Sequence, residues 1–218
     1  MLKGVFEWRS RRSGPLTTNF AEAGGFIKSA PDEAIPDLQL HFVVGKLVDH
    51  GRKTVFGHGY SCHVCLLRPR SRGTLRLASA DPQVAPLIDP AFLKDPDDMA
   101  RLLRGFKLVR RLLQQPALAR HGGQETAASR HAQSDAQIEQ FIRNHADTIY
   151  HPVGTCRMGA DAGAVVDARL RVHGVSGLRV VDASVMPSVV GGNTNAPVIM
   201  MAEKATDMIR GDHPPRRA

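Results

Sequence analysis

The chain has 218 residues and a mass of 23.7 kDa, the size of one large domain or two small ones. Apolar residues make up 42% of it, which argues against a disordered chain, and no apolar stretch approaches the ~20 residues needed to span a bilayer. The net charge of +8 favours acidic partners, but the basic residues are dispersed and match no zinc-finger or RNA-binding pattern, so specific nucleic-acid binding is not expected.

Alternating apolar residues predict strands in the first eighty residues. Residues 37–44 place apolar side chains at every second position, as a half-buried strand does. Residues 60–68 and 73–79 are rich in strand-forming residues, and the turn signal at 71–73 predicts a hairpin between them. Upstream, residues 23–26 (AGGF) predict a flexible point.

Apolar residues three or four positions apart predict a helix over residues 96–115, which Pro116 ends. The opposite face of this helix is expected to be basic, with Arg101, Arg104, Lys107 and Arg111. A second helix should begin at Ser134, because Ser134 and Gln137 have the spacing of a capping box. Between the two helices, residues 121–130 predict a loop.

The chain changes character near Asp147, after which Gly, Val and Ala dominate. Residues 177–182 (GLRVVD) predict a buried strand that ends on an acid. A last helix should begin near Asn195, with Pro197 in its first turn, where no amide hydrogen is needed, and Gly211 just past its end.

Cys62 and Cys65 form a C-x-x-C pair, which suggests zinc or a redox couple. A structural zinc needs four ligands and a second pair is absent, while a redox pair normally opens a helix rather than lying within a strand. We therefore interpret both as packing residues and expect no metal site. Three cysteines, an odd number, indicate a reducing compartment, and the N-terminal residues lack a signal peptide. We expect a cytoplasmic protein with at most peripheral contact with the inner membrane.

Three features toward the C-terminus could carry chemistry. His151 lies in YHPVGTCRMG. A lone histidine is usually structural, although histidine is the residue type whose ordinary pKa suits proton transfer at neutral pH. Residues 191–197 (GGNTNAP) lead into a helix start, which would stabilise an anion or an electron-rich ring; the alternative is an N-cap with a glycine hinge. Asp182 follows an apolar segment, where it could hold a ligand hydroxyl or simply form a turn.

Together and in this order, these features resemble the C-terminal half of the glucose–methanol–choline (GMC) family of FAD-dependent oxidoreductases. The matching segments are residues 14–19 (GPLTTN), 22–26 (EAGGF), 68–73 (RPRSRG), 151–159 (HPVGTCRMG), 179–187 (RVVDASVMP) and 192–197 (GNTNAP). Within the family, the sequence of these segments is most similar to the choline dehydrogenase and aliphatic alcohol dehydrogenase branch.

The resemblance implies roles for individual residues. His151 matches the catalytic histidine, which takes the alcohol proton as hydride leaves the α-carbon for flavin N5. Asn193 matches the second active-site position, which orients the substrate oxygen; an amide cannot titrate, so His151 is the only base of the pair. The implied cofactor-binding residues are Asp182 and Ala183, near the FAD ribityl and pyrophosphate groups, and Thr194, Asn195, Ala196 and Pro197, beside the flavin pyrimidine edge.

The family's N-terminal dinucleotide-binding motif, G-x-G-x-x-G, is absent here, so we expect a fragment or one part of a split enzyme, with Met1 internal to a longer parent. The expected fold is α+β: an antiparallel sheet with packed helices, forming a substrate-binding domain over residues 1–146. Residues 147–218 are expected to carry the active site and to complete an FAD-binding α/β domain whose N-terminal Rossmann half is missing.

The predicted function is that of an FAD-dependent choline or aliphatic alcohol dehydrogenase. Its expected partners are a small alcohol, a quinone or other electron acceptor, and a chain that supplies the missing FAD domain. One alternative is a non-catalytic remnant or partner module that cannot bind FAD alone. Another is a basic binder of nucleic acid or of an anionic surface.

Overall fold

The computed structural model describes residues 2–48, 53 and 57–212. The chain forms two compact units: residues up to Leu66 together with Met99–His145, and residues Leu67–Asp98 together with those from Ala146 onward. Residues 67–98, which the predicted division places in the first domain, thus belong to the second unit. The division by role, into a substrate-binding part and a flavin part, stays a prediction.

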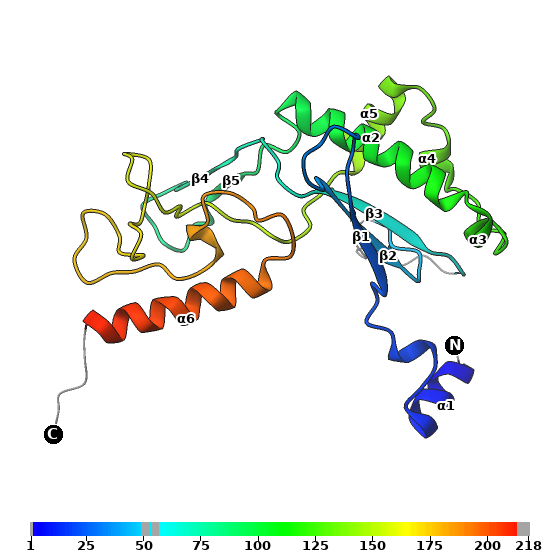
Figure 1. Cartoon of the computed structure of the whole chain (residues 1–218), viewed down its shortest axis with the longest axis horizontal. Coiled ribbons are helices and arrows are strands. Elements are labelled where there is room, and N and C mark those ends of the chain that lie inside the picture. The colour runs from blue at the N-terminus through cyan, green and yellow to red at the C-terminus, as the bar shows by residue number, and fades with distance from the viewer. Residues whose placement is uncertain (1, 49–52, 54–56, 213–218) are drawn as a thin grey trace. The chain divides into compact units, whose positions relative to one another are not determined.

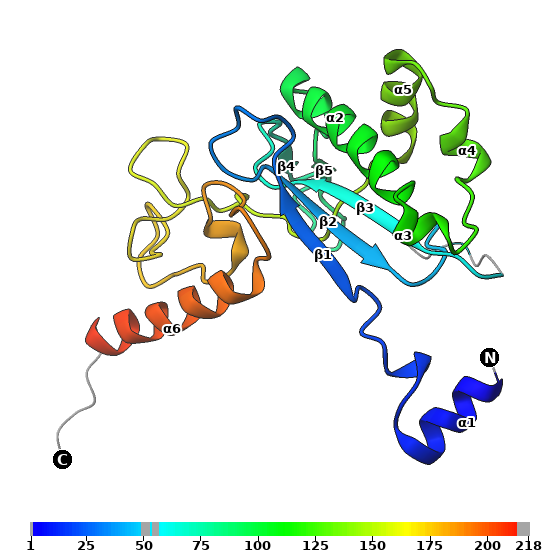
Figure 2. The same ribbon diagram turned by 45° about the vertical axis from the view of Figure 1, so that its right-hand side comes forward.

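The first unit is built on an antiparallel sheet of three strands in the order β1-β2-β3, shown in Figures 1 and 2. Its strands are β1 (Ala23–Ile27), β2 (Leu38–Val43) and β3 (Ser61–Leu66). The central strand β2 buries Leu38 and Leu40, as its alternation predicts, but it then buries Val43 and leaves Val44 58% exposed, so the predicted alternation fails at the end of the strand. The strands predicted over residues 37–44 and 60–68 are confirmed as β2 and β3. The prediction of a flexible point at residues 23–26 is wrong, because these residues form β1. This segment pairs with β2 from Ala23↔Phe42 to Ile27↔Leu38, and the pairing overrides the weak strand propensity of its two glycines.

Helix α2 (Pro96–Leu113) confirms the predicted helix and lies across this sheet (Figures 1 and 2). Its closest approach is at Gly105, where an added Cβ would lie 2.9 Å from Cδ1 of Leu38 and 3.0 Å from Cγ2 of Val64. The glycine therefore lets the helix backbone approach the sheet. The expectation of a uniformly basic outer face is wrong at Arg101, which is only 6% exposed because its side chain lies on the packed side of the helix.

Three further helices complete this part of the first unit: α3 (Pro116–Ala119), α4 (Ala127–Arg130) and α5 (Asp135–His145). The predicted capping box is confirmed, since Oε1 of Gln137 accepts the Ser134 amide at 3.0 Å and Oγ of Ser134 accepts the Gln137 amide at 3.3 Å. The expected loop at 121–130 is wrong in its last four residues, which form α4. Near the N-terminus, α1 (Leu2–Arg11) and a 3₁₀ turn, η1 (Pro15–Thr17), were not anticipated.

The second unit begins with a short antiparallel pair, β4 (Thr74–Arg76) and β5 (Leu87–Asp89). The predicted hairpin between residues 60–68 and 73–79 is wrong, because β4 pairs with β5 and β3 pairs with β2. The reason lies at Asp98, whose two carboxylate oxygens accept the amides of Arg70 and Ser71 at 2.8 Å each. The two amides therefore bind a carboxylate in the first turn of α2, and they do not form the hydrogen bonds of a strand pair.

The rest of the second unit is irregular chain packed against α6 (Asn195–Asp212), beside it in Figures 1 and 2. A core cluster of Val166, Leu170, Val185 and Ala205 joins the helix to this chain. The predicted last helix is confirmed from its start at Asn195, but the expected stop before Gly211 is wrong, since the helix continues through Gly211 to Asp212. The predicted buried strand over 177–182 is wrong: Leu178 is 50% exposed and the segment makes only an isolated bridge, Arg171↔Arg179. Two backbone hydrogen bonds, from the Val172 amide to the Leu178 carbonyl and from the Val180 amide to the Leu170 carbonyl, flank this bridge, and no regular ladder forms there.

No helix among the described residues is long and apolar enough to cross a membrane. The cysteine pair lies within β3, as predicted, and burial raises the pKa of both the Cys62 and the Cys65 thiols. Sγ of Cys65 lies 3.8 Å from Nε2 of His41 on the neighbouring strand.

Candidate active site

The segment that follows His151 is held by backbone hydrogen bonds to a distant part of the second unit. The Cys156 amide donates to the Ser184 carbonyl at 3.0 Å, and the Met158 amide donates to the Val185 carbonyl at 2.8 Å. Because Val185 is fully buried in the core cluster, these bonds fix the loop on a rigid support.

The segment with the predicted cofactor residues Asp182 and Ala183 is a capped 3₁₀ turn, η3 (Ala183–Val185). Oδ1 of Asp182 accepts the Ser184 amide at 2.7 Å, which is the usual arrangement of an aspartate N-cap. Asp182 is exposed and Ala183 is half-buried. Asp182 therefore forms a turn, which was one of the two interpretations of this residue. Because Oδ1 accepts the Ser184 amide, Oδ2 is the carboxylate oxygen that could bind another group.

Thr194 is the residue at which the chain enters α6. Its carbonyl accepts the Val198 amide at 3.0 Å, the first hydrogen bond of the helix, and Pro197 stands in the first turn as predicted. The preceding bend packs closely on Arg68, because a Cβ on Gly191 would lie 1.9 Å from Nη1 of that arginine. A larger residue at this position would displace the Arg68 side chain, so the RPRSRG segment lies directly against the bend that leads into α6.

The structure brings His151 and Thr194 together. Nδ1 of His151 lies 2.8 Å from Oγ1 of Thr194, a hydrogen bond between residues 43 positions apart. Thr194 is 8% exposed and His151 is half-buried, so one edge of the imidazole is held and shielded. The N-terminus of α6 and the predicted histidine therefore belong to one site.

Three of the other predicted residues lie beside Thr194 in the chain. Asn193, Asn195 and Ala196 are exposed at the start of α6, where first-turn amides have no partner inside the helix and carry a partial positive charge. The predictions missed the contact between Thr194 and His151 and the packing of Arg68. The first of these contacts joins positions 43 residues apart, so the sequence carried no local signal for it.

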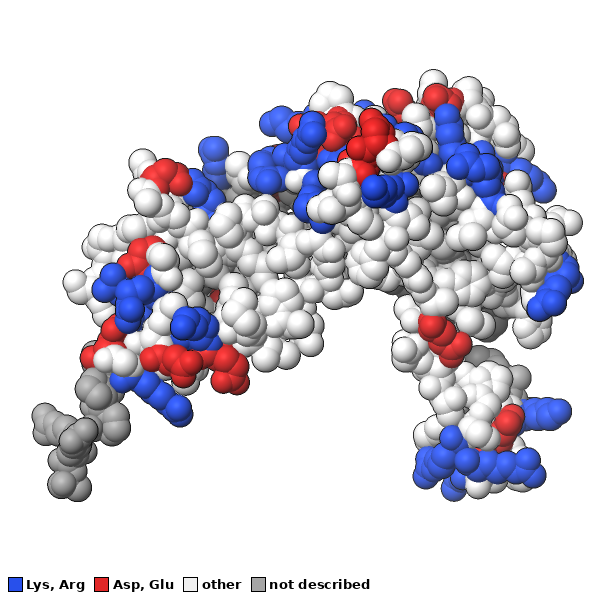
Figure 3. All heavy atoms as spheres, viewed as in Figure 1, with Lys and Arg blue, Asp and Glu red and all other residues white. Residues whose placement is uncertain are grey.

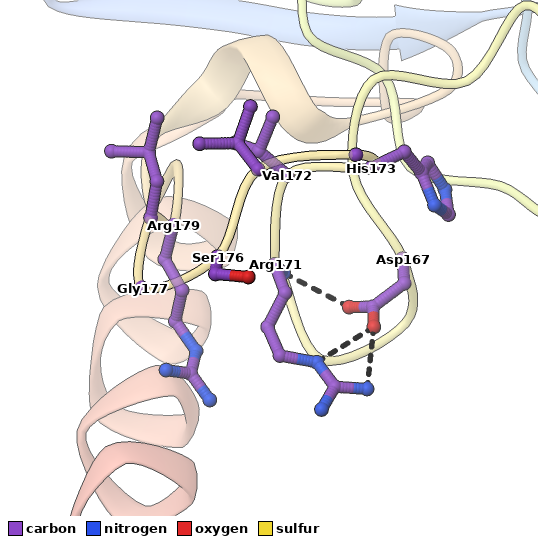
Figure 4. A pocket seen from close by; sticks show the side chains of 10 residues that line it. Asp167, Arg171, Val172, His173, Ser176, Gly177 and Arg179 are labelled. Carbon is purple, nitrogen blue, oxygen red and sulfur yellow. Dashed lines mark hydrogen bonds and ion pairs between the residues drawn. The ribbon is translucent and has the colours of Figure 1, made fainter.

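A separate cavity of about 380 Å³ lies in the same unit and shares no residue with the predicted set. Figure 4 shows the Arg171 guanidinium turned toward Asp167, with Nε of Arg171 2.8 Å from Oδ2 of the aspartate. Backbone and side-chain hydrogen bonds from Arg171 lower the pKa of Asp167. This cavity is framed by a satisfied ion pair, so it offers no free charge for a ligand.

Basic side chains elsewhere are interspersed with acidic ones (Figure 3). On α2, Nζ of Lys107 lies 2.6 Å from Asp135 and Nη2 of Arg110 lies 2.8 Å from Glu125. In the second unit, Arg169 and Arg179 both pair with Asp212. These basic side chains are thus paired with acidic neighbours, which argues against a continuous basic surface for nucleic acid at these positions.

A histidine held at the N-terminus of a helix, on an α+β scaffold, is the arrangement that the GMC resemblance implies. The profile of the GMC oxidoreductase family, C-terminal portion, matches residues 69–202, more than half of the chain. The chain therefore belongs to the GMC oxidoreductase family, and the resemblance is confirmed.

Its relatives include the alcohol dehydrogenase [acceptor] of Pseudomonas putida, 50% identical over 208 residues, and the oxygen-dependent choline dehydrogenase of Klebsiella pneumoniae subsp. pneumoniae, 44% identical over 208 residues. Each match covers 95% of this chain and 38% of the relative, so the chain spans well under half the length of these proteins.

Solved structures agree with this assignment. A formate oxidase of Aspergillus oryzae RIB40, in a study of FAD modification, superposes with a TM-score of 0.81 at 26% identity, covering 97% of this chain and 41% of the oxidase. Pyridoxine 4-oxidase from Mesorbium loti superposes with a TM-score of 0.72 at 29% identity, covering 87% of this chain and 38% of that protein. The expected α+β fold is confirmed.

Proposed function

We propose that this chain supplies the proton-accepting and substrate-facing part of an FAD-dependent dehydrogenase that oxidises an alcohol to an aldehyde. The observation that carries the proposal is the placement of His151 by Thr194 at the start of α6. The family membership and the alcohol and choline dehydrogenases among the relatives support it.

The residues present fit FAD. The exposed start of α6, at Asn195 and Ala196, suits a group that gains negative charge. Asp182 keeps one oxygen to accept a hydroxyl of the ribityl chain, since the other accepts the Ser184 amide. The buried hydroxyl of Ser184 has no hydrogen-bond partner among the described residues, which is consistent with a bound group completing this segment.

The proton transfer follows from the geometry of the histidine. Nδ1 of His151 is engaged by Thr194, so Nε2 is the nitrogen that takes the hydroxyl proton of the alcohol. The amide of Asn193 would donate to the substrate oxygen and orient it, without competing for the proton. FAD, when bound, would supply the acceptor for the hydride of the α-carbon; with its hydroxyl proton taken by His151, the alcohol would leave as the aldehyde.

The substrate class is an alcohol of the aliphatic or choline type, and the acceptor of the electrons is a quinone or similar molecule rather than a nucleotide. The first test uses the full-length protein with bound FAD, a series of 1-alkanols and choline, and an artificial quinone as acceptor. Turnover with either alcohol class supports the proposal and identifies the substrate. No flavin bleaching by any alcohol under anaerobic conditions would contradict it.

The alternative function is that of a partner module that cannot hold FAD alone. Its test is the visible spectrum of the purified 218-residue chain after incubation with FAD and gel filtration. Retained flavin bands would exclude this alternative. A colourless chain that restores FAD binding on mixing with the remaining part of the protein would establish it.

A further inference from the structure

We propose that Thr194 is a positioning residue that sets the tautomer of His151: its hydroxyl oxygen accepts a hydrogen bond from Nδ1–H, so that the lone pair stays on Nε2. The two atoms lie 2.8 Å apart, and Thr194 is 8% exposed. This inference rests on the proposed function, because only a base needs a free lone pair on Nε2.

The backbone explains why the Thr194 oxygen is available as an acceptor. An N-cap threonine usually accepts the amide of the second or third helical residue. In α6 the third helical residue is Pro197, which has no amide hydrogen. One of the two amides that usually bind an N-cap hydroxyl is thus missing, and Oγ1 of Thr194 lies 2.8 Å from Nδ1 of His151. The Thr194 carbonyl begins the helix by accepting the Val198 amide at 3.0 Å.

The position of Thr194 is rigid, which a positioning residue requires. A threonine has few side-chain rotamers because it branches at Cβ, and this one is fixed at the entry to an eighteen-residue helix. Ala205 of the same helix is 2% exposed in the core cluster with Val185, whose carbonyl accepts the Met158 amide. Both partners of the hydrogen bond are thus attached to one packed core.

The tautomer determines whether the histidine can act. With the proton on Nδ1, Nε2 carries a lone pair and can accept the alcohol proton. With the proton on Nε2, Thr194 would have to donate to Nδ1, and the nitrogen that faces the substrate would hold no lone pair. Free histidine in water favours the proton on Nε2, so a residue that reverses the preference contributes to catalysis through the histidine.

The test compares Thr194→Val, which removes the hydroxyl at nearly constant volume, with Thr194→Ser, which keeps it. Thr206→Val is the matched control, since Thr206 is exposed in the same helix and its hydroxyl donates only to the Ala202 carbonyl, at 2.9 Å. The tautomer is read from ¹⁵N NMR of the histidine rings in the chain above pH 8, with the His151 signals assigned by their loss in His151→Gln.

The expected result is a proton on Nδ1 in the parent, Thr194→Ser and Thr206→Val, and a shift toward Nε2 in Thr194→Val. In the full-length protein, Thr194→Val should lower kcat about tenfold with little change in KM, and Thr194→Ser should restore most of it. A parent chain with the proton on Nε2, or a Thr194→Val chain that keeps it on Nδ1, overturns the inference.

The two proposals fail in different ways. If His151→Ala leaves flavin reduction intact, the proposed function fails whatever the tautomer. If His151→Ala abolishes reduction while Thr194→Val retains both the Nδ1 proton and the parent rate, only the role of Thr194 fails. Thermal unfolding of each variant, followed by circular dichroism, separates a lost hydrogen bond from a lost fold.

Discussion

Replacing Asp98 with alanine should destabilise the second unit strongly, because this buried carboxylate binds two successive backbone amides of the bend that precedes β4. Asp98 is 1% exposed, and its two oxygens each accept a backbone amide, from Arg70 and Ser71, at 2.8 Å. A hydrogen bond to a charged group contributes about 1.5–3 kcal/mol, and the two amides are only partly shielded from water. We therefore expect a loss of about 2–4 kcal/mol, a large part of the total stability of a domain.

The assay is urea and thermal unfolding of the chain, followed by circular dichroism at 222 nm. A loss of this size lowers Tm by roughly 5–15 °C for a chain of this length. Asp97→Asn is the matched control: the neighbouring side chain is 34% exposed and lies 3.4 Å from Nε of Arg70, so its ion pair should contribute under about 1 kcal/mol. Equal Tm values for Asp98→Ala and Asp97→Asn would refute the assignment of Asp98 as the anchor of this bend.

Three further predictions follow from the packing and the charges. Gly105→Val should cost about 1–3 kcal/mol in urea unfolding, because the new side chain would overlap Leu38 and Val64; an unchanged midpoint would contradict the close packing of α2 on the sheet. Hydrogen bonds from Arg179 and Arg169 lower the pKa of Asp212 from its ordinary value of 3.8. The ionised carboxylate should therefore stabilise the end of α6 fully above about pH 4, and this stabilisation should be lost as the pH falls through the lowered pKa of the folded chain. Asp212→Asn should abolish this part of the dependence of Tm on pH, and a parallel acid transition in both chains would show that the ion pairs are not formed. Since burial raises the pKa of the Cys62 and Cys65 thiols, both should react slowly with a thiol reagent at pH 8 in the folded chain and rapidly in urea; equal rates would contradict their burial.

Local sequence patterns predicted those elements that local interactions define. The helix at 96–113, the capping box at Ser134 and Gln137, and the start of α6 at Asn195 all follow from periodicity or from side chains within four residues of one another. These features need no information about the rest of the chain.

The predictions failed where distant partners decide the structure. The pairing of 23–27 with β2 and the capture of the Arg70 and Ser71 amides by Asp98 depend on residues more than ten positions away. The segment 177–182 has the composition of a buried strand, yet Leu178 is 50% exposed, Val180 is only half-buried, and the segment makes a single bridge. Composition alone does not show whether a partner strand is present.

The same distinction applies to the candidate site. The family motifs pointed to His151, Asn193 and the start of α6, and the roles of these residues stay predictions. The hydrogen bond between His151 and Thr194 joins positions 43 residues apart, so no local pattern could have predicted it. The structure thus adds a contact that turns two separate motifs into one site.

The most direct test of the central claim is anaerobic flavin reduction by the alcohol substrate in the full-length protein carrying His151→Ala. The control is His173→Ala, because this exposed histidine only contacts the Gly159 carbonyl through Nε2, at 3.1 Å. If His151 accepts the alcohol proton, its removal should slow reduction about 10²–10⁴-fold while the flavin stays bound, and the control should reduce its flavin at the parent rate. A His151→Ala protein that reduces its flavin as fast as the control would contradict the account.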